Sequence, residues 1–174
     1  MVARAGRPVL GNVMQMAWVT PDMERSLEQF KAIYRVPEFL VMEQVFPAEA
    51  FGRSGEMSLR MALANIDHMQ IELIECRTDG IGSIYREVLP KDGSHANVFH
   101  HVCLKFRGSL SDWEAHVAGL GPDQPVVYTG DIGPGARFLY TDHRATIGLY
   151  VEHVWFSPET EAWLADAIPT YRTL

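Results

Sequence analysis

The chain has 174 residues, of which 47% are hydrophobic and 21% charged, so it is long enough to bury one sizeable core without disulfides. This composition excludes an intrinsically disordered protein, and no apolar run reaches the roughly 18 to 20 residues that span a bilayer. The formal net charge of -7, with Lys and Arg scattered along the sequence, argues against nucleic acid as a partner.

The N-terminal segment carries Arg4 and Arg7 before an apolar stretch, but polar residues interrupt that stretch and no small-x-small cleavage site follows. Two cysteines, Cys76 and Cys103, are too few for a disulfide framework and lack a C-x-x-C spacing. We therefore expect a cytoplasmic protein with no membrane partner, in which both thiols are small buried groups.

The first half of the chain predicts one strand, one helix and three further strands. Alternation over 12–19 indicates a buried strand, after which Thr20 and Pro21 predict the start of a helix that runs to about Tyr34. A loop is predicted at 47–55 and a turn around 65–67. The three further strands are predicted over 36–45, 57–64 and 69–76.

The second half repeats this order after a connector with a short helix at 83–89. A strand over 98–106 is followed by a helix that Ser109 opens and that Gly119 ends. A C-terminal helix begins near Ser157 and Pro158. Three more strands lie between these helices, at 124–129, 137–141 and 147–156.

The two halves of the chain also agree in the spacing between strand and helix. Gln15 to Phe30 and His101 to His116 both span 15 positions, so strand and helix fall in register in the two halves. We predict an α+β fold in which two βαβββ modules form paired curved mixed sheets around a central cup. The whole chain, 1–174, would then be one domain, with modules at 11–76 and 98–156, a connector at 77–97 and a C-terminal helix and tail at 157–174.

Four isolated polar residues occupy matching points of this repeat within apolar strands: Gln15, Glu72, His101 and Glu152. An unpaired carboxylate or imidazole in such a place costs several kcal/mol, so something must compensate it. For any one residue alone, a buried hydrogen-bonded network is the simpler explanation. Together, one imidazole, two carboxylates and an amide oxygen are a plausible ligand set for a divalent ion.

Strand alternation also separates these residues from their neighbours. Glu75, His100 and His153 each lie one or three positions from a candidate ligand, so their side chains should point to the opposite face of the sheet. We therefore expect these three residues to be structural or exposed, and not to bind the ion.

The motifs at these residues resemble the vicinal oxygen chelate superfamily, which includes glyoxalase I, methylmalonyl-CoA epimerase, extradiol dioxygenases, and fosfomycin and bleomycin resistance proteins. The resemblance covers about residues 11–156, and the segment 70–87 is similar to the epimerase-related branch. Four motifs carry it, in the family's order: Met14 to Val19, Gln70 to Glu75, Phe99 to Val102 and Gly148 to Glu152.

The resemblance implies one divalent ion per cup, of Zn, Ni, Co, Mn, Fe or Mg, held by Gln15, Glu72, His101 and Glu152. It implies a metal-dependent lyase or isomerase that enolises a small oxygenated substrate, such as an acyl thioester. Glu152 is then the first candidate for moving the proton and Glu72 the second, while the third-strand base of the epimerases matches Arg60.

Two other functions remain open for the same cup. One is a non-catalytic protein that binds an aromatic or antibiotic small molecule, and the other is an extradiol-type dioxygenase. The sequence also leaves open whether the cup forms within one chain or across a homodimer.

Overall fold

The computed structural model describes residues 13–173, which form nine strands with short helices between them. Asn12, predicted to start the first strand, lies outside the described residues, as do the segment with Arg4 and Arg7 and the last residue of the predicted tail. No helix in the described part of the chain is long and apolar enough to cross a membrane.

The elements follow the predicted repeat. The first module contains β1 (Val13–Val19), α1 (Met23–Tyr34), β2 (Leu40–Ala50), β3 (Arg53–Ile66) and β4 (Met69–Cys76). The second contains β5 (Val98–Lys105), α3 (Leu110–Ala118), β6 (Val126–Ile132), β7 (Ala136–Asp142) and β8 (Tyr150–Phe156). The shorter or later elements are α2 (Ser83–Arg86), α4 (Arg144–Ile147), α5 (Pro158–Ala167) and β9 (Thr170–Tyr171).

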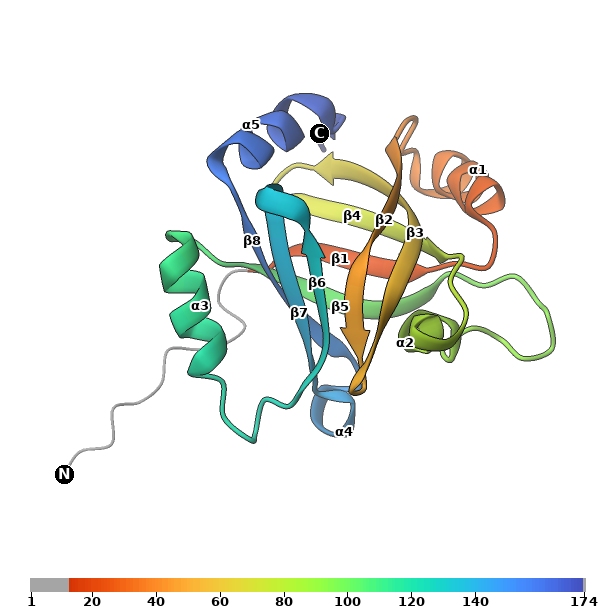
Figure 1. The fold of residues 1–174 in the computed structure, drawn as a ribbon. Coiled ribbons are helices and arrows are strands. Elements are labelled where there is room, and N and C mark those ends of the chain that lie inside the picture. Colours follow the sequence, from red (N-terminus) through yellow and green to blue (C-terminus); the bar gives the residue numbers. More distant parts are fainter. Residues whose placement is uncertain (1–12, 174) are drawn as a thin grey trace.

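The strands form one sheet that curls into a barrel-like cup (Figure 1). Their order is β2-β6-β7-β8-β5-β1-β4-β3-β9, and β2 also pairs with β3, which closes the sheet on itself. The parallel pairs β1–β4 and β5–β8 lie side by side in the middle, joined by antiparallel pairing of β1 with β5. The predicted α+β fold of two βαβββ modules around a central cup is confirmed.

The hairpin of β2 and β3 is longer than predicted, because the expected loop at 47–55 is mostly strand. Ala50 pairs with Arg53, so only Phe51 and Gly52 form the turn, with φ angles of 50° and 72°. Two positive φ angles match the twist of a two-residue hairpin turn. Pro47 lies within β2, where β6 has not yet begun to pair, so its missing N–H breaks no bond with that neighbour.

Two predicted element boundaries are also wrong. The cap of α1 is Asp22, whose carboxylate accepts a hydrogen bond from the Arg25 amide at 3.1 Å, and not Thr20, whose hydroxyl instead contacts Ser26 at 2.5 Å. The last strand starts at Tyr150 because residues 144–147 form α4, which ends before Gly148 at a φ of 79°. The short β9, which pairs with β3, was not predicted.

Apolar residues fill the sheet on both faces. On the outside, α1 packs through Met23 and Phe30, and α3 packs through Trp113. On the inside, α2 inserts Tyr85 into the core of the cup. The C-terminal helix α5 lies at the rim of the cup (Figure 1). Because α1 and α3 cover the outer face of the sheet, its concave face is free to form a site.

Candidate active site

His101 and Glu72 lie in one row across the middle of the sheet. His101 on β5 pairs with Ala17 on β1, and Ala17 pairs in turn with Glu72 on β4. Directly paired residues point to the same face of a sheet. Because Ala17 has only a methyl group, the two longer side chains meet, with His101 Nε2 3.5 Å from Glu72 Oε2.

Glu152 joins them from the neighbouring row. It pairs with Cys103 on β5, two positions along from His101, and its Oε2 lies 3.1 Å from His101 Nε2. One ligand atom from each of Glu72, His101 and Glu152 lies within 4.8 Å of the other two, and all three residues are buried. We call these three residues the carboxylate–histidine cluster.

The geometry of the cluster fits a divalent ion. His101 Nε2 is fully buried, and one carboxylate oxygen each of Glu72 and Glu152 faces it. With metal–ligand bonds of about 2.1 Å, neighbouring ligand atoms lie about 3.0 to 3.4 Å apart, close to the 3.1 and 3.5 Å found here. Mixed nitrogen and oxygen donors suit Zn, Ni, Co, Mn, Fe or Mg.

The same three side chains perturb one another's protonation. Burial raises the pKa of Glu72, and the nearby Glu152 carboxylate raises it further. Burial by itself lowers the pKa of His101, but Glu152 and Glu72 outweigh it and raise the value to about 9. Without an ion, the two carboxylates therefore hold a proton on His101, which a cation bound in its place would displace.

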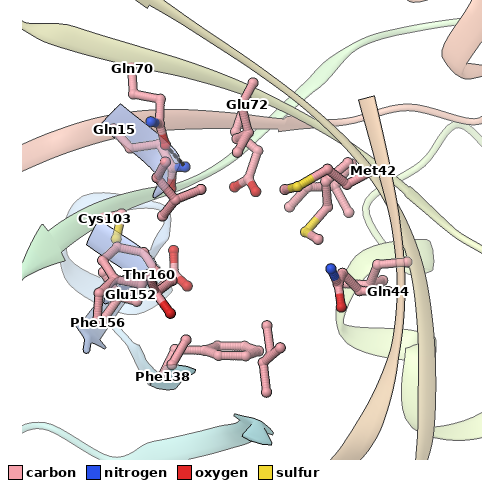
Figure 2. Close-up of a pocket in the computed structure, with 18 of the residues that line it drawn as sticks. Gln15, Met42, Gln44, Gln70, Glu72, Cys103, Phe138, Glu152, Phe156 and Thr160 are labelled. Atoms are coloured by element: carbon pink, nitrogen blue, oxygen red, sulfur yellow. Dashed lines mark hydrogen bonds between the residues drawn. The ribbon is translucent and has the colours of Figure 1, made fainter. Parts of the chain in front are cut away.

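Gln15, the fourth predicted ligand, lines the same cup but binds another side chain. Its amide nitrogen donates a hydrogen bond of 2.6 Å to Gln70 Oε1, and Gln70 donates to Asn65 at 3.3 Å. Figure 2 shows Gln15 and Gln70 side by side, away from the Glu72 carboxylate. The structure thus brings Glu72, His101 and Glu152 together and places Gln15 in a polar row next to them.

The expectation that His100 points away from His101 is wrong. Ala17 pairs with His101 but Trp18 pairs with Phe99, so His100 has no partner on β1 and forms a β-bulge. The bulge turns both imidazoles toward each other, with 2.9 Å between their Nδ1 atoms. Alternation assumes unbroken pairing, so no pattern in the sequence indicated this contact.

The hydrogen bonds of His100 define the tautomer of its neighbour. Its Nε2 lies 2.8 Å from the Ile84 carbonyl oxygen, which can only accept, so this nitrogen donates. His100 Nδ1 then accepts from His101 Nδ1–H, which leaves the lone pair of neutral His101 on Nε2, toward Glu72 and Glu152. Burial, followed by the charge of His101, lowers the pKa of His100 to about 3, so it stays neutral.

The other two off-face residues take structural positions. Glu75 accepts a hydrogen bond of 3.2 Å from the Met23 amide at the start of α1 and faces Arg77. His153 is buried against α3, with its Nδ1 3.0 Å from His116 Nε2. Arg60 also faces outward, where it forms an ion pair with Glu24 at 2.6 Å.

The cup above the cluster has a volume of about 860 Å³, counted out to solvent. In Figure 2, Glu72 and Glu152 point into this hollow, while Met42 and Gln44 form the opposite wall. Two further residues of the cup, Tyr85 and Tyr140, were missed: their hydroxyls are 3.0 Å apart and buried. Tyr140 pairs with Glu152, so correct alignment of the last two strands would have indicated it.

Comparison with known proteins finds this fold in solved structures, whereas no family model and no curated protein matches the sequence. Methylmalonyl-CoA epimerase from Mycobacterium tuberculosis is 16% identical, with a TM-score of 0.53 over 87% of this chain and 91% of that one. A variant of the Streptomyces coelicolor epimerase, in complex with 2-nitronate-propionyl-CoA, is 18% identical, with a TM-score of 0.50 over 84% and 95%. A hypothetical protein from Bacillus halodurans is 13% identical, with a TM-score of 0.51 over 84% and 94%.

The chain shares the fold of these methylmalonyl-CoA epimerases. In this copy of that fold, the first module contributes Glu72 and the second contributes His101 and Glu152. The three residues of the cluster therefore all come from one chain. At these identities the likeness establishes the fold, and the chemistry must be argued from the site itself.

Proposed function

We propose that the cup is the active site of a metal-dependent isomerase or lyase, which moves a proton on the carbon next to a carbonyl group. The observation that carries this proposal is the buried convergence of His101 Nε2 with two carboxylates, those of Glu72 at 3.5 Å and Glu152 at 3.1 Å. A small oxygenated substrate, including the acyl group of a thioester, would reach these residues through the open side of the cup.

Each residue then has a definite task. A divalent ion held by Glu72, His101 and Glu152 would supply an electrophile for the substrate oxygens. Glu152 points into the cup and removes or returns the proton on carbon, with Glu72 as the second candidate. The walls exclude water, which strengthens the electrostatic interactions at the floor of the cup.

Metal binding is the first test. Calorimetric titration with Mn²⁺ and Zn²⁺ should show one ion per chain, and His101→Ala and Glu152→Ala should each weaken it by tenfold or more. Glu75→Gln is the matched control, because this carboxylate is on the same strand as Glu72 but faces outward. Unchanged affinity in both ligand variants would contradict the assignment.

Catalysis is tested by exchange of a carbon-bound proton with solvent. Metal-loaded protein in heavy water, offered 2-oxo thioesters, branched acyl-CoA esters and hemithioacetals, should label at least one of them, and Glu152→Gln should slow labelling by about 100-fold or more. Tight binding without exchange would favour a sequestering protein. Oxygen uptake with a catechol and ferrous ion would favour a dioxygenase.

A further inference from the structure

The wall of the cup is mainly apolar. Phe46 and Phe138 face each other as an edge-to-face pair, with ring centroids 5.6 Å apart, and α5 adds Trp163 at the mouth, which is 52% exposed. The remaining apolar lining comes mainly from Met14, Met42, Leu59, Met61, Leu63, Ile74, Ile132, Val154, Phe156 and Leu164. Such a wall stabilises an aryl or alkyl group by removing it from water.

The charged side chains that line the cup are all acidic. Among the described residues that line it, the charged side chains are Glu72 and Glu152. The nearby arginines of β3 and β7 are held outside the cup, where Arg60 pairs with Glu24 at 2.6 Å and Arg137 pairs with Asp131 at 2.7 Å. Two carboxylates also balance one divalent ion, so the occupied cluster would offer no excess positive charge to an anion.

An anionic group against the wall of this cup would lose its water without gaining a cationic partner. Burying an unpaired charge in that way is strongly unfavourable, whereas a neutral group has no such cost. We propose that the part of the substrate that enters the cup is uncharged and mainly apolar, with two neighbouring oxygens for the cluster and an aryl or branched alkyl body for the wall. This inference rests on the proposed function, and it excludes acyl groups that carry a free carboxylate.

Gln44 is a position at which a positive charge can be added to the wall of the cup. Its side chain extends from β2 into the cup, opposite the Glu72 and Glu152 carboxylates (Figure 2). Glu43 and Val45, its neighbours on β2, point outward, so a longer side chain at position 44 would still face the cup. Gln44→Lys would therefore add one cation to the wall, and Gln44→Met, of similar length, would add none.

The experiment uses two probes that differ by one charge, 2-hydroxyacetophenone and its 4-carboxylate. Both present a hydroxyl and a carbonyl oxygen on adjacent carbons, and both exchange the carbinol hydrogen on enolisation. With metal-loaded wild-type protein in heavy water, we expect kcat/KM for exchange to be at least about 100-fold higher for the neutral probe. Gln44→Lys should narrow this ratio by tenfold or more, and Gln44→Met should leave the ratio unchanged.

Calorimetric titration of the same two probes provides a readout that needs no turnover. Tighter binding of the neutral probe supports the inference even if neither probe exchanges, a result that would count against the proposed function alone. Equal affinity and equal exchange of the two probes would overturn the inference while upholding the proposed function. Binding of the carboxylate probe in preference, or of neither probe, would also overturn it.

Discussion

His100 is the extra residue that a β-bulge adds to β5, and it links the candidate ligand His101 to the backbone of α2. The Ile84 carbonyl fixes the proton of His100, and His100 in turn fixes the proton of His101. A histidine ligand commonly has such a partner on its second nitrogen, which sets the ring orientation and the tautomer. His100 is therefore a positioning residue in the proposed site, and it contacts His101 without being one of the residues that line the cup.

Replacing His100 should weaken metal binding without removing a ligand. We expect His100→Leu to lower the affinity for Mn²⁺ or Zn²⁺ by about 10- to 100-fold, because His101 loses the acceptor that holds its tautomer. His100→Gln should recover much of the loss, since its amide can accept from His101 and donate to Ile84. Nitrogen chemical shifts of His101 would report the tautomer directly, and thermal unfolding would show whether each variant is folded.

At the scale of elements, β8 carries different chemistry on its two faces. Glu152 faces the cup, while His153 faces α3 and forms a buried network with His116 and Thr141, at 3.0 and 3.4 Å. Burial, and then the neighbouring His116, lowers the pKa of His153 from 6.5 to about 4. The packing of α3 on the sheet therefore depends on a neutral imidazole.

This buried histidine should make the fold sensitive to acid. The unfolded chain binds a proton at His153 below about pH 6.5 and the folded chain only below about pH 4, so stability falls as the pH drops through that window. The free energy of unfolding can be measured in urea at pH 7 and at pH 4.5. Its loss between these two pH values should be smaller for His153→Gln than for wild type, by on the order of 1 to 3 kcal/mol. His68→Gln, an exposed control, should follow wild type.

At the scale of the whole molecule, the two modules meet a second time where β2 of the first pairs with β6 of the second. Gly130 lies at this seam, opposite Ala48 on β2 and Phe138 on β7. The Phe138 ring packs directly over it, so that a Cβ at position 130 would lie 2.3 Å from Phe138 Cζ. Because Gly130 has no side chain, the Phe138 ring, which forms part of the wall of the cup, can pack against the seam.

Gly130→Ala should accordingly disturb both the seam and the cup. We expect the free energy of unfolding to fall by about 1 to 3 kcal/mol, because the Phe138 ring must move out of a packed core. Urea unfolding measures this loss, and Thr129→Ala, at the adjacent exposed position of β6, should change stability by less than about 0.5 kcal/mol. Equal losses of stability in the two variants would show that the Phe138 ring moves aside without destabilising the fold.

The sequence by itself determined the two modules and most strand positions, and it placed Gln15, Glu72, His101 and Glu152 on the strands that line the cup, because alternation and an internal repeat are local properties that survive folding. It could not determine what depends on strand pairing. Three features arise only when strands distant in sequence come into register: the bulge at His100, the row that places Ala17 between His101 and Glu72, and the pairing of β2 with β6. The tertiary structure therefore decided that His100 contacts His101, that Gln15 binds Gln70, and that the walls of the cup are mainly apolar, since each depends on neighbours that the chain order does not reveal.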